Sequence, residues 1–169
     1  MHGLQVVATE GPDSVEFNEL PEPPVGSLIV DVRAAGVGFP DLLMARGEHQ
    51  IRQPVPFTLG WEAAGVVSSA PEGSGFDAGD EVVTLSLGSF AQKVAAVPEA
   101  TFRKPSGLTW EQAGAFPMNY LTALEANAII VHGTMCLIRR AAMDRAGGWA
   151  GDRSCEDTDL GLAVIEHGW

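Results

Sequence analysis

The stretch from Val30 to Val67 constrains the fold of this 169-residue chain more than any other part of it. An apolar run, Leu28–Val32, leads into a corner of small residues, Ala34-Ala35-Gly36-Val37-Gly38. A short helical segment, Asp41–Arg46, and a Pro-rich crossing separate it from a second apolar run, Phe57–Val67. Short apolar runs bounded by turn residues are typical of strands. We therefore expect two strands joined by a tight corner and a single short helix.

Further short strands are predicted on both sides of this stretch. They cover Leu4–Ala8, Val15–Asn18, Glu81–Leu85, Ser89–Ala96 and Thr101–Lys104, with turns at Gly11-Pro12-Asp13 and Gly79-Asp80. A series of about six to eight short strands with turns between them favours an all-β barrel or sandwich over alternating βαβ units. The fold class is thus mainly β with helices, an α+β chain.

Two helices are expected after the last strand. Thr109 and Gln112 have capping-box spacing, so a helix should begin at Trp110 and end before Pro117. A second helix is expected over Asn119–Ala126.

Two short sequences carry a family resemblance, Gly38-Phe39-Pro40-Asp41 and Gly60-Trp61-Glu62. The chain resembles the GroES-like catalytic domain of medium-chain dehydrogenases and reductases over Met1–Ala126. The zinc alcohol dehydrogenases of that family have a Cys-His pair before the Asp, and Gly-His-Glu in the second sequence. Glycine and tryptophan cannot replace a thiolate and an imidazole as zinc ligands. The pattern is therefore similar to the zinc-independent quinone oxidoreductase branch, which uses hydride from NADPH.

The resemblance continues through GDEVVTL, SFAQKVAAVP, KPSGLTWEQAGAFP and NYLTALEA. It implies a substrate cleft lined by Phe39, Asp41, Trp61 and Glu62. It also implies that Asn119, Tyr120 and Thr122 face the nicotinamide, and that no metal is bound.

Simpler roles remain open for several of these residues. Asp41 has the position of a plain helix N-cap. Trp61 is expected to fill the volume of the absent metal site, and Glu62 to pair with a nearby arginine. Without a second domain, Asn119 and its neighbours are expected to be packing or surface residues.

The sequence shows no strand, glycine-rich turn and helix of the kind that binds a dinucleotide. Its match to the glycine spacing, Gly73–Ala78, precedes another turn rather than a helix, so we interpret it as a loop. We therefore expect a GroES-like domain over residues 1–125 that lacks its NADPH-binding partner domain and is inactive alone.

Residues 126–169 are predicted to form a short α/β tail. The phrases HGTMCLIRRAAMDRAGGW and CEDTDLGLAVIEHGW resemble part of a family-two glycosyltransferase. That resemblance implies that Asp157 is the general base, with Glu156 beside it. The alternative is that these acids cap the last helix. The whole is interpreted as a chimera, and a residual glycosyltransferase and a non-enzymatic scaffold are the rival functions.

Composition narrows the range of partners, metal sites and cellular locations to be expected. A net charge of -12 argues against nucleic-acid or anionic-membrane partners. Cys136 and Cys155 are expected to be reduced thiols, and a metal site that combines them with His132 or His167 is weakly supported. The N-terminus lacks a signal-peptide pattern, so a cytoplasmic location is the default. An apolar face left uncovered by a missing domain predicts a homodimer.

Overall fold

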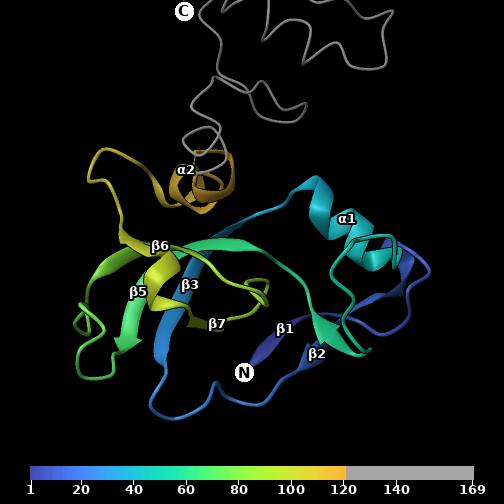
Figure 1. The fold of residues 1–169 in the computed structure, drawn as a ribbon, viewed down its shortest axis with the longest axis horizontal. Coiled ribbons are helices and arrows are strands. Elements are labelled where there is room, and N and C mark those ends of the chain that lie inside the picture. The colour runs from blue at the N-terminus through green and yellow to red at the C-terminus, as the bar shows by residue number, and fades with distance from the viewer. Residues whose placement is uncertain (121–169) are drawn as a thin grey trace, which may run out of the picture. The chain divides into compact units, whose positions relative to one another are not determined.

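The structure, a computed structural model, describes residues 1–120 (Figure 1). The chain divides into two compact units, Met1–Met118 and Asn119–Trp169, and the first contains both sheets. The predicted boundary at residue 125 and the predicted α/β tail lie outside the described residues. Within the described part no helix is long and apolar enough to cross a membrane.

The smaller of two sheets contains three antiparallel strands in the order β2-β1-β4. They are β1 (His2–Val6), β2 (Val15–Glu19) and β4 (Phe57–Thr58). Val6 lies opposite Val15 on one side and Phe57 on the other. This pairing ties the end of the Pro-rich crossing to the first strand of the chain.

The larger sheet contains five antiparallel strands in the order β7-β3-β5-β6-β8. They are β3 (Leu28–Gly36), β5 (Glu62–Ser69), β6 (Glu81–Leu85), β7 (Lys93–Ala96) and β8 (Thr101–Arg103). An isolated bridge between Gly3 and Ala91 links β1 to the segment that leads into β7. The predicted class, mainly β with helices, is confirmed.

Short helical segments lie between the strands and after the last of them. They are the 3₁₀ turns η1 (Pro12–Ser14) and η2 (Pro98–Ala100) and the α-helices α1 (Phe39–Ala45) and α2 (Trp110–Gly114). Figure 1 shows α1 and α2 on the same side of the sheets. Residues 117–120 are helical as well, so the second predicted helix begins at Pro117 rather than Asn119. Proline suits a first helical position because it lacks the N–H that would have no partner there.

Buried apolar side chains gather into three clusters. The largest contains Leu28, Val30, Val67, Val82, Val94 and Ala96 from the five-stranded sheet. The second contains Val6, Met44, Ala45, Phe57 and Leu59, and joins α1 to the smaller sheet. The third, of Ala64, Val83 and Ala113, packs α2 against the larger sheet.

The predicted corner at residues 34–38 differs from the structure. Strand β3 continues through Ala34 and Ala35 to Gly36, which pair with β5. These residues are small because α2 packs closely above them: a Cβ on Gly114 would lie 2.9 Å from the backbone of Ala34. Small side chains here reflect helix-on-sheet packing as much as a turn.

A buried hydroxyl network joins β6 to the connection that follows β7. The Thr84 hydroxyl lies 2.8 Å from both Ser86 Oγ and Thr101 Oγ1. Ser86 Oγ also accepts from Val97 N at 3.0 Å, and Thr101 Oγ1 donates to Val97 O at 2.7 Å. Because buried hydroxyls are costly without partners, this network stabilises one chain path.

We predict that Gly65→Ala destabilises the fold by at least about 2 kcal/mol, because overpacking at a site that cannot yield is costly. A Cβ on Gly65 would overlap with the carbonyl oxygen of Asp31 on the paired strand. Urea unfolding measures the change. Gly107→Ala is the matched control, since nothing lies within 4 Å of its added Cβ. Equal stability of the two variants would contradict this packing.

Candidate active site

Asp41 links the start of α1 to the segment before β5. Its Oδ2 accepts a hydrogen bond from Gly38 N at 2.8 Å, and its Oδ1 accepts one from Gly60 N at 3.2 Å. The side chain is 5% exposed. The helix begins at Phe39 with Gly38 as its N-cap residue, so Asp41 is the third helical residue and not the N-cap. The N-cap interpretation of Asp41 is therefore wrong, although its carboxylate does satisfy a backbone donor at the helix start.

Glu62 is the first residue of β5 and is also 5% exposed. Its Oε2 accepts a hydrogen bond from Met118 N at 2.8 Å. Gly36 lies opposite it on β3, and a Cβ there would overlap with Glu62 Oε1. The absence of a side chain at residue 36 thus makes room for the carboxylate.

The predicted pairing of Glu62 with an arginine is wrong for the described part of the chain. Within residues 1–120 the ion pairs are Met1–Glu22, Lys93–Glu22, Arg103–Asp80 and Lys104–Glu81. Backbone N–H groups are instead the partners of both buried acids. The strand position of Glu62 indicated burial, but the sequence contained no signal for a donor that lies 56 residues away.

Burial shifts the protonation of both acids in the same direction. Desolvation raises the pKa of Glu62 to about 7; the hydrogen bond from Met118 N lowers it, and the charge of Asp41 raises it. Desolvation also raises the pKa of Asp41, against its bonds from Gly38 and Gly60. The largest cause is the same for both acids, since burial disfavours the charged form of a carboxyl.

Trp61 lies between the two acids in sequence and packs against the cluster that contains Met44 and Phe57. The His49 ring is tilted over it, with ring centroids 5.1 Å apart. His49 Nδ1 accepts from Ile51 N at 3.1 Å, so a neutral His49 carries its proton on Nε2. The packing role predicted for Trp61 is consistent with this contact.

Two other predicted site residues have exposed side chains. Phe39 and Tyr120 are large apolar or aromatic side chains with exposed fractions of 59% and 53%. Thr122 and Asp157 lie outside the described residues, so their predicted roles stay predictions. Hydrogen bonds hold Asp41 and Glu62, and the Trp61 ring contacts His49.

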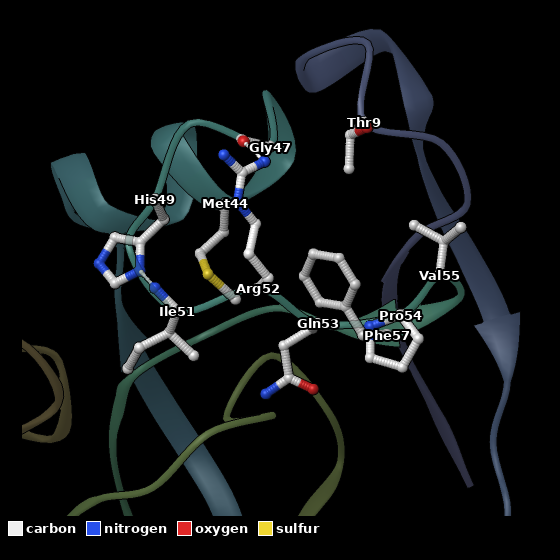
Figure 2. A pocket seen from close by; sticks show the side chains of 10 residues that line it. All are labelled: Thr9, Met44, Gly47, His49, Ile51, Arg52, Gln53, Pro54, Val55 and Phe57. Atoms are coloured by element: carbon white, nitrogen blue, oxygen red, sulfur yellow. Dashed lines mark hydrogen bonds between the residues drawn. The ribbon is translucent and has the colours of Figure 1, made fainter.

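A pocket of about 330 Å³ lies beside this site and was not predicted from the sequence (Figure 2). Its wall contains Thr9, Met44, Gly47, His49, Ile51, Arg52, Gln53, Pro54, Val55 and Phe57. Figure 2 shows Thr9 on the far side of the opening from His49 and Ile51. The Arg52 guanidinium donates to Gly47 O and so orders the segment. His49 belongs to the wall of this pocket and also contacts Trp61, so the pocket adjoins the site. The Pro-rich composition of residues 51–56 was the sole sequence feature that pointed to the pocket.

Metal ligation has no candidate group among residues 1–120, where no three His, Cys, Asp or Glu side chains lie close enough to hold an ion. The zinc-free prediction rests on Gly38 and Trp61 at the ligand positions of the resembled enzymes, and it stays a prediction.

The fold and the buried acids define a class of protein. Residues 24–130 match the alcohol dehydrogenase GroES-like domain, and the chain belongs to that family.

Individual relatives extend this assignment. The mouse synaptic vesicle membrane protein VAT-1 homolog is 42% identical over 105 residues, which are 61% of this chain and 26% of the relative. Rat quinone oxidoreductase-like protein 2 is 32% identical over 148 residues, which are 83% of this chain and 42% of the relative. The second match therefore continues beyond residue 126.

Solved structures support the assignment to this family. A probable oxidoreductase from Mycobacterium abscessus has a TM-score of 0.69 and 40% identity, covering 75% of this chain and 41% of the other. Escherichia coli quinone oxidoreductase complexed with NADPH has a TM-score of 0.68 and 27% identity, covering 75% and 40%. The chain thus spans less than half the length of these relatives.

We predict that Glu62 makes the folded state less stable as pH rises. Its folded pKa of about 7 exceeds the ordinary value of 4.5, so the folded state holds a proton that the unfolded chain releases. The stabilisation is complete below about pH 4.5 and is lost by about pH 7, a loss of up to about 3 kcal/mol.

Urea unfolding of the wild type and Glu62→Gln between about pH 5 and pH 8 measures this loss. The variant should show a flatter dependence, because its amide does not ionise. Glu72→Gln, at an exposed loop position, is the control and should keep the wild-type slope. An unchanged slope in Glu62→Gln would show that another group causes it.

Proposed function

We propose that this chain supplies the substrate-binding part of a zinc-independent, NADPH-dependent quinone reductase. The observation that carries the proposal is a GroES-like domain with Gly38 and Trp61 in place of metal ligands, while Asp41 and Glu62 remain as buried acids held by backbone N–H groups. The quinone oxidoreductase names among the matched relatives and structures support the substrate class.

Each side chain has a physical role in this proposal. Phe39 is exposed at the start of α1 and offers an aromatic face to a planar substrate. Trp61 forms a rigid wall that is backed by the cluster around Met44. Asp41 and Glu62 fix the backbone on both sides of that wall, and burial raises the pKa of both carboxyls, that of Glu62 to about 7. NADPH, when bound by a reductase of this type, supplies the hydride.

We propose no pyrophosphate site within residues 1–120. Gly73 and Gly75 have φ of 82° and 80° and lie in a turn, with further turn residues after them and no helix. A dinucleotide phosphate needs backbone N–H groups at a helix start. The prediction that residues 73–78 form a loop is confirmed, and we assign no reaction step to residues 1–120 through the cofactor.

The 169-residue polypeptide assayed by itself is therefore proposed to be catalytically incomplete. Hydride transfer requires the nicotinamide to be held against the substrate in a defined geometry. Asn119, Tyr120 and Thr122 are proposed to contribute to one wall of that geometry, and the other wall belongs to a nucleotide-binding domain. Substrate binding, by contrast, needs the first wall alone.

Two titrations test the proposal. NADPH followed by nicotinamide fluorescence should show no saturation up to about millimolar concentration, which corresponds to a binding free energy weaker than about 4 kcal/mol. Duroquinone, a fully substituted quinone that does not alkylate thiols, should shift the ¹H–¹⁵N signal of the Trp61 indole.

The Trp110 indole is an internal control, because Trp110, on α2, packs beside Lys104. Trp61→Phe identifies the Trp61 signal. Tight NADPH binding would contradict the incomplete state, and equal shifts of both indoles, or none, would contradict the substrate site.

The other interpretations of residues 126–169 remain as rivals. The glycosyltransferase-like role of Asp157 and the chimeric origin of the tail are proposals that residues 1–120 do not address. The match to rat quinone oxidoreductase-like protein 2, which extends beyond residue 126, favours continuity with the reductase family there.

A second copy of the chain is the partner that we propose. Val37, two residues before α1, and Phe39, its first residue, have exposed fractions of 78% and 59%, and a second copy would cover them. Sedimentation velocity at micromolar concentration should show a dimer for the wild type, and monomer for Phe39→Ser. A monomeric wild type would contradict the proposal. We propose no nucleic-acid or membrane partner. We propose that the protein is located in the cytoplasm.

A further inference from the structure

The first turn of the helix that begins at Pro117 is hydrogen-bonded to a side chain of the larger sheet. The first N–H groups of a helix have no partner within it. Met118 N belongs to this group, and it donates to Glu62 Oε2 at 2.8 Å. A carboxylate at this position also interacts favourably with the positive end of the helix dipole.

The surroundings of Glu62 leave its carboxylate little freedom. Glu62 is on β5, between β3 and β6, with Gly36 on one side and Leu85 on the other in register. Gly36 lacks the Cβ that would overlap with Oε1. The space at residue 36 is therefore occupied by the acid itself.

The charged group that acts on Glu62 lies on α1. Asp41 is the acidic group whose charge acts on Glu62, while β3 and β6 present the uncharged Gly36 and Leu85 beside it. Within residues 1–120 no ion pair includes Glu62. The donor that the structure shows for its carboxylate is the N–H group of Met118.

We propose that Glu62 is a positioning residue whose ionised carboxylate fixes the first turn of the helix beginning at Pro117, from which the chain continues into Asn119. The inference rests on the proposed function in one respect only, the assignment of Asn119, Tyr120 and Thr122 to the wall that faces the nicotinamide. Protonation of Glu62 replaces a charge-assisted bond with a neutral one and removes the interaction with the dipole. The helix start is then held less firmly.

Selective ¹⁵N-methionine labelling of the full chain tests this directly. Of the five methionines, Met1 has no amide, so four signals are expected. The Met118 amide proton should move upfield as pH falls, with a midpoint near 7. The Met44 amide, on α1, reports whether the fold is intact and should not follow this curve.

Three variants complete the experiment. Glu62→Gln should abolish the Met118 transition and increase hydrogen exchange at that amide about tenfold, the difference between a charged and a neutral hydrogen bond. Gly36→Ala displaces the carboxylate and should have the same effect with Glu62 present. Gly107→Ala, where nothing surrounds the added Cβ, should behave as the wild type.

A flat Met118 titration in the folded wild type overturns the inference, as does a transition that persists in Glu62→Gln. Both readings come from the wild type and an isosteric variant, so an unfolded Gly36→Ala does not decide the result. None of the signals depends on NADPH or quinone. Failure of the proposed function would appear in the ligand titrations while the Met118 transition remained.

Discussion

The satisfaction of two buried carboxylates by backbone N–H groups is the constraint on which the site depends. Asp41 holds Gly38 and Gly60 together, and Glu62 holds Met118 against β5. A buried charge without such donors would be neutralised or exposed. Three segments that are distant in sequence are therefore fixed by acids rather than by apolar packing alone. In this arrangement the same residues that stabilise the fold also set the geometry next to Trp61.

Much of the fold was predictable because its strands have a local signature. The strand over Glu81–Leu85 and the helix over Trp110–Gly114 have the predicted starts, and the capping box of Thr109 and Gln112 is present in both directions. Periodicity and caps depend on neighbours in sequence. Strand β3 was placed less well: its small residues resemble a turn until the helix that packs on them is known.

The site was less predictable because its partners are far apart in the chain. Resemblance identified Asp41, Trp61 and Glu62, but an arginine partner was expected for Glu62, where the structure shows the amide of Met118. A backbone amide has no sequence signature, since every residue except proline carries one. The pocket beside His49 has the same origin, because its wall combines residues 44–57 with Thr9.

The close approach of Gly114 to Ala34 fixes the distance between α2 and β3. At Gly114 the helix has no Cβ facing Ala34, so the separation of α2 from β3 at this position is set by closely approaching backbone atoms, which hardly compress. The chain leaves α2 only three residues before Pro117. A single added methyl group at Gly114 would therefore act as a wedge, displacing the chain at the point where it turns towards Met118.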